Sequence, residues 1–131
     1  MRAASGGGGG GLAAVVPAGT YFKDIPTGTA NVGITFANTG NWSATDDDLS
    51  TGTWKTGTGV VGDYAIRWTT TAGALTTGTS GSWFPLSSSI TYGIFQTGSG
   101  NNVCTGTVEI RRVVDSVVIA AGVISLNATV T

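Results

Sequence analysis

Histidine is absent from this sequence of 131 residues, and cysteine occurs only once. Without histidine the chain lacks the general base of Ser-His-Asp and Cys-His catalysis, and also the commonest zinc ligand. The single cysteine, Cys104, can form neither an internal disulfide nor a thiolate cluster. We therefore expect no catalytic residue, no cofactor and no metal. We interpret Cys104 as a small buried apolar side chain, with a contact between chains as the alternative.

Charge is also scarce, because only 10% of the residues are Asp, Glu, Lys or Arg, against about 25% in an average domain. The net charge of −1 leaves no basic surplus to neutralise phosphates, so nucleic acid is not an expected partner. Threonine, serine, glycine and asparagine are abundant instead, which favours strands and turns over helices. Low charge also means little repulsion between copies, which suits a protein held in an assembly.

The chain has no long uninterrupted apolar run. The most apolar stretch, residues 113–130, contains Asp115, Ser116 and Gly122 and is not expected to insert into a membrane. Residues 1–5 lead into glycines rather than into an apolar segment, so a signal peptide is not expected.

A run of six glycines precedes a short apolar segment near the N-terminus. Ordering each glycine costs backbone entropy and buries no side chain, so the run needs an external partner to hold it. We expect residues 1–18 to be an extended arm that docks on a neighbouring protein, and residues 19–131 to form the folded domain. The alternative is a flexible linker. The expected docking residues are Gly6, Gly7, Gly8, Gly9, Gly10, Gly11, Leu12, Val15 and Val16.

Apolar and polar residues alternate in several short segments after residue 19, which is the pattern of half-buried strands. The clearest are residues 32–36, 63–70 and 90–96, followed by a hairpin of residues 103–113 and 117–130. Shorter strands are expected at 42–45, 50–55, 74–76 and 82–86. Strands of this number and spacing predict an all-β, antiparallel, two-layer sandwich, Ig-like or jelly-roll-like. The predicted core contains Ile34, Phe36, Tyr64, Ile66, Trp68, Val108, Ile110, Ile124 and Leu126.

Two features suggest a surface that another chain covers. The last strand is apolar on both faces in its first half, where Val117, Ile119 and Val123 lie, so it is either central or covered. Trp54 lies in a Thr/Gly-rich stretch and is the tryptophan expected to be most exposed. The four tryptophans could stack on sugars, but in a domain with few large apolar residues we favour core or interface packing.

The charged residues offer little chemistry. Residues 46–48 are three consecutive aspartates, which point to alternate faces of an extended chain and do not form a glycosidase pair. We interpret them as a solvated acidic turn, with a calcium site as the alternative. For Arg67 and Arg111 the ordinary explanation is cross-strand pairing with Asp63 or Glu109.

Several stretches resemble the small β-sandwich domains of tail and accessory proteins in tailed-phage virions. They are Asn41-Trp42, residues 62–68 (GDYAIRW), 78–86 (GTSGSWFPL), 106–111 (GTVEIR) and 123–128 (VISLNA). The resemblance covers roughly residues 30–131 and rests on packing motifs rather than on chemistry.

The resemblance implies a non-enzymatic virion protein, assembled in the bacterial cytoplasm as a homo-oligomer among other virion proteins. It supplies no active site. The alternative is a carbohydrate-binding module or adhesin-type domain whose partner is a cell-surface glycan. A carboxylate-dependent glycan hydrolase is the least favoured reading.

Overall fold

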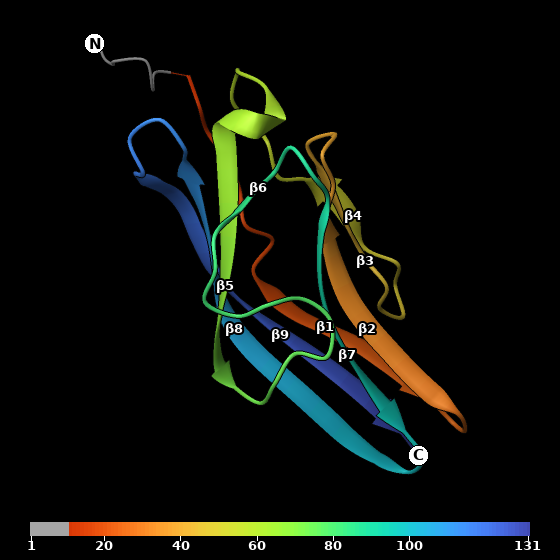
Figure 1. Cartoon of the computed structure of the whole chain (residues 1–131). Coiled ribbons are helices and arrows are strands. Elements are labelled where there is room, and N and C mark those ends of the chain that lie inside the picture. Colours follow the sequence, from red (N-terminus) through yellow and green to blue (C-terminus); the bar gives the residue numbers. More distant parts are fainter. Residues whose placement is uncertain (1–10) are drawn as a thin grey trace.

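The computed structural model describes residues 11–131, which form two packed β-sheets (Figure 1). One sheet has five strands in the order β1-β9-β8-β5-β6, and the other has four in the order β4-β3-β2-β7. The predicted all-β sandwich is confirmed. The elements are β1 (Gly19–Ile25), β2 (Thr29–Phe36), β3 (Asn41–Ala44), β4 (Thr51–Thr53), the 3-10 helix η2 (Val61–Asp63), β5 (Tyr64–Ala72), β6 (Phe84–Pro85), β7 (Ile90–Thr97), β8 (Gly100–Arg112) and β9 (Val118–Val130).

One strand pair departs from the predicted antiparallel arrangement. Strand β1 pairs with β9 in parallel, from Gly19 opposite Ile124 to Ile25 opposite Val130. The N-terminal segment enters at the end of the sheet where β9 begins, so β1 runs in the same direction as β9. The chain then crosses to the second sheet through the turn at residues 26–28 and begins β2.

The predicted hairpin of β8 and β9 is confirmed and forms the longest pairing in the molecule. Its register runs from Gly100 opposite Val130 to Arg111 opposite Val118, with one irregularity after Ile110. The short strand predicted at 74–76 is absent: this stretch is bent, and only isolated bridges, such as that of Thr77 to Gly93, connect it with the second sheet.

Aromatic side chains fill the space between the sheets. Trp68 from β5 stacks on Tyr92 from β7 with ring centroids 5.2 Å apart, and Tyr92 meets Phe36 edge-on at 6.5 Å. Gly106 lies under the indole of Trp68, where a methyl group would overlap the ring. All nine predicted core residues are buried.

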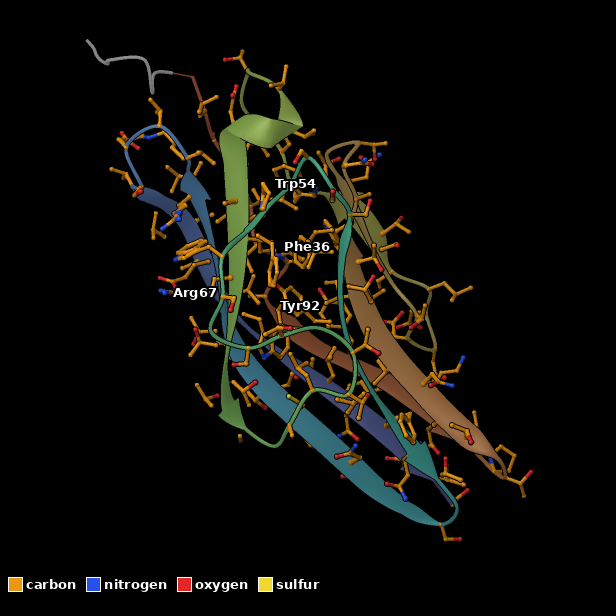
Figure 2. The ribbon with its side chains drawn as sticks, in the orientation of Figure 1. Phe36, Trp54, Arg67 and Tyr92 are labelled. Carbon is orange, nitrogen blue, oxygen red and sulfur yellow. The ribbon has the colours of Figure 1, made fainter. Side chains whose placement is uncertain are left out.

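The expected exposure of Trp54 is wrong. This side chain is fully buried, and Figure 2 places it between the sheets above Phe36 and Tyr92. Its ring meets Tyr64 edge-on with centroids 5.2 Å apart, and its Nε1 donates to the Ala37 carbonyl over 2.8 Å. Trp54 is therefore a core residue and is removed from the candidate interface.

Replacing Trp54 with alanine should lower the free energy of unfolding by about 3–5 kcal/mol, because a large buried ring is lost and a cavity is left. Urea denaturation followed by circular dichroism measures this change. The matched control is Val114→Ala, at a valine that is 71% exposed, which should alter stability by no more than about 0.5 kcal/mol. Equal effects of the two substitutions would contradict the placement of Trp54.

Candidate interaction surface

Residues 11–18 pack on the sandwich of their own chain. Val16 is only 9% exposed, and Leu12 packs against the same core. The Val15 amide donates to the Trp54 carbonyl over 2.8 Å, and the Thr56 and Gly57 amides donate to the Ala13 carbonyl. Val16 is therefore a core residue of its own chain, and Leu12 is half-buried against that core.

Two local features hold this segment in place. The Tyr21 hydroxyl donates to the Pro17 carbonyl over 2.6 Å, and burial raises the pKa of this phenol, so the donating form is retained. Gly57 permits the backbone of residues 11–13 to approach closely, since a Cβ there would overlap it. Of the predicted docking residues, Gly11 and Val15 remain exposed, while Gly6 to Gly10 lie outside the described residues.

Removing residues 1–10 should leave the free energy of unfolding unchanged within about 0.5 kcal/mol, because the described core begins after them. Val16→Ala in the full chain should cost about 2 kcal/mol, since two buried methyl groups are removed. Thermal and urea unfolding of both proteins provide the comparison. A large loss on deleting residues 1–10, with no effect of Val16→Ala, would contradict this division of the chain.

Exposed apolar side chains are concentrated at the end of the β8–β9 hairpin. Five of the eleven large apolar residues exposed among residues 11–131 lie between positions 113 and 123. We call them the hairpin surface: Val113, Val114, Val117, Val118 and Val123. Val117 and Val123 were predicted as interface residues and are exposed as expected, whereas Ile119 is only partly exposed and packs against the core.

The same half of β9 has an open backbone edge. Strand β1 covers β9 only from Ile124 to Val130, and Figure 1 shows β1 beginning part-way along β9. Residues 118–123 therefore pair with β8 on one side and with no described strand on the other. An uncharged strand with a free edge is a site where another strand can pair.

A hollow of about 420 Å³ lies beside the hairpin surface, where the described chain begins. Leu12, Asp63, Val113 and Val114 line it together with Thr58 and two glycines. The Asp63 carboxylate accepts a hydrogen bond from the Val60 amide over 3.0 Å. The hollow is thus mainly apolar, with one carboxylate at its wall.

The outer face of the five-stranded sheet carries a charged cluster on β5 and β8. Arg67 donates to Glu109 over 2.6 Å, which confirms the predicted cross-strand pairing for this arginine; Figure 2 shows Arg67 pointing away from the core. Arg111 does not pair with Glu109. Its guanidinium lies 4.1 Å from the centre of the Trp83 ring, and that of Arg67 lies 4.6 Å from it. This stacking accounts for the half-burial of Trp83.

The aspartates at 46–48 do not form a uniform solvated turn. Asp46 is buried and accepts bonds from the amide and the hydroxyl of Ser50, over 2.9 and 2.8 Å. Asp47 instead faces the Asp24 amide on β1. The Asp46 side chain thus closes the turn, and the Asp47 side chain connects it to β1. No cluster of metal-ligating residues occurs within residues 11–131.

The pKa values of Cys104 and Asp115 are shifted by burial and by hydrogen bonding within the fold. Cys104 is fully buried, as predicted, and burial raises the pKa of its thiol. A hydrogen bond from Arg112 lowers the pKa of Asp115 in the hairpin turn. In the part of the chain that the structure describes, no helix is long and apolar enough to cross a membrane.

No known protein family, no curated protein and no solved structure matches this chain.

Proposed function

We propose that this chain is a non-enzymatic structural protein of a tailed-phage particle, present in symmetric copies in the tail, neck or capsid. The observation that carries the proposal is the hairpin surface beside the open edge of β9. Clustered apolar groups at one end of a domain are typical of surfaces that another protein covers. The sequence resemblance to small virion β-sandwich domains points in the same direction.

The open edge supports contact between copies of the chain. Residues 118–123 contain no charged side chain, so two copies can approach along this edge without electrostatic repulsion. Antiparallel pairing of two such edges gives a two-fold contact in which the same residues serve both partners. A two-fold contact of this kind closes at a dimer, so larger symmetric assemblies need a second contact in addition.

The N-terminal arm supplies a second contact in this proposal. Residues 1–10 precede Gly11, and the next residue, Leu12, lines the 420 Å³ hollow. A neighbouring virion protein can order a glycine-rich segment by hydrogen-bonding its backbone, because glycine allows close approach. The docking role that was expected of residues 1–18 is thereby confined to residues 1–11 and the exposed Val15.

An acidic residue in the hairpin surface should reduce incorporation into particles. Val114→Asp would place a carboxylate in the proposed contact, where its desolvation is unfavourable, and should lower the number of copies per particle by about tenfold or more. Quantitative mass spectrometry of purified particles, assembled in cells that supply the variant in place of the native chain, measures this number.

The matched control is Val103→Asp, because Val103 is an exposed valine that lies on β8, outside the hairpin surface. It should be incorporated at the native level, and both variants should melt like the native chain. Particles that contain no copies of the native chain would refute the proposed role. Equal incorporation of Val114→Asp and the native chain would refute the hairpin surface as the contact.

For the second candidate, a carbohydrate-binding domain, three of the four tryptophans offer no free ring, and Trp42 is half-buried beside a hollow of about 380 Å³. Trp54 and Trp68 are buried, and Trp83 is stacked with two arginines. A hollow on the outer face of the four-stranded sheet favours glycan binding instead.

A further inference from the structure

The outer face of the four-stranded sheet contains a hollow that the proposed assembly role does not use. It has a volume of about 160 Å³ and lies across β2 and β7. The hairpin surface belongs to the other sheet, so a chain held through that surface can leave this hollow accessible.

Two glycines form the floor of the hollow. Gly33 on β2 lies directly opposite Gly93 on β7, so no side chain rises from the middle of this face. The Gly33 carbonyl accepts from the Thr45 amide over 2.9 Å, and Gly93 exchanges two backbone bonds of 3.0 Å with Thr77. The backbone of the floor is thus already paired, and an added peptide strand would find no partners there.

The walls combine one aromatic ring with uncharged polar groups. On one side Phe95 lies opposite Asn31, and on the other Thr91 lies opposite Thr35. Phe95 is 46% exposed although it is a large apolar residue in the middle of a strand. Thr35 and Thr91 bond to each other over 2.7 Å.

Two polar side chains at the hollow have no partner among residues 11–131. Neither the Asn31 amide nor the Thr77 hydroxyl makes a hydrogen bond there. Asn31 therefore offers both a donor and an acceptor, and Thr77 offers a hydroxyl that can act as either. Both face the same hollow as the exposed ring of Phe95.

This combination selects a class of ligand. A neutral sugar ring has an apolar C–H face, which an aromatic ring attracts through its negative π surface, and a rim of hydroxyls, which amides and hydroxyls recognise. No charged side chain lines the hollow, so nothing there favours an anion. The volume is below the roughly 300–1,000 Å³ of pockets that engulf a ligand, which fits one ring lying on the surface.

We propose that this hollow, which we call the glycine-floored site, binds a neutral saccharide through Phe95, Asn31 and Thr77. The ring of Phe95 receives the C–H face of one sugar unit, and Asn31 and Thr77 bond its hydroxyls. In a virion protein this would add recognition of a neutral host glycan to the structural role. The site belongs to a single chain, so the proposal does not depend on assembly.

The purified full chain should first be applied to an array of neutral and acidic oligosaccharides. The neutral set contains oligomers of glucose, galactose and N-acetylglucosamine. The strongest neutral binder should then be titrated by calorimetry into the native chain and into variants. Phe95→Ala should weaken binding by about tenfold or more, and Asn31→Ala should weaken it severalfold.

The matched control is Phe22→Ala, because Phe22 is a similarly exposed phenylalanine, 55% against 46%, on the other sheet. It should bind the saccharide like the native chain, and the melting temperature of each variant verifies its fold. Amide resonances of Gly33 and Gly93 should shift on titration.

Binding of no neutral oligosaccharide at millimolar concentration would overturn the proposal. Retention of full affinity by folded Phe95→Ala would also overturn it, as would equal losses in Phe95→Ala and Phe22→Ala. None of these results bears on incorporation into particles, so the two proposals can fail separately.

Discussion

The sandwich depends on aromatic packing between its two sheets. Trp68 and Tyr92 stack across the core, and Trp54 and Tyr64 meet edge-on nearer the end where the chain enters. The other large, fully buried side chains are Phe36 and several isoleucines and leucines, which pack around these rings. These rings supply a large part of the buried apolar area that opposes chain entropy. Glycine at position 106 is a consequence of this packing, because the indole of Trp68 occupies the space above it.

The two sheets present different kinds of surface to the solvent. The five-stranded sheet presents the hairpin surface and an open edge at one end, which are features of a protein that is covered by others. The four-stranded sheet presents a polar hollow with a single exposed ring. A domain with these two faces can be anchored on one side and can contact a ligand on the other. This arrangement unites the two functions that we propose, although each rests on its own residues.

The sequence was sufficient to predict the fold class and the core because alternation is a local signal: Tyr64, Ile66 and Trp68 are buried as their spacing requires. The sequence was insufficient where tertiary contacts determine the burial of a side chain or the pairing of a strand. Trp54 lies among polar residues and glycine, yet the core receives its ring. Val16 precedes the first strand, yet it packs against Gly122 of β9. The parallel pairing of β1 could not be predicted, because it depends on the end of the sheet at which the N-terminal segment enters.

Of the two candidate sites, the Gly33–Gly93 pair was missed because its members are 60 residues apart and meet only through the register of β2 and β7. The hairpin surface had a visible signal in the consecutive valines at 113–114 and 117–118.

Hydrogen–deuterium exchange tests the central claim of an assembly contact most directly, by comparison of the free chain with the chain in purified particles. The account predicts that residues 113–123 exchange about tenfold or more slowly in the particle, because the hairpin surface and the open edge of β9 are covered there. Buried strands such as residues 124–130 should exchange alike in both samples. Identical exchange of residues 113–123 in the free and the assembled chain would contradict the account.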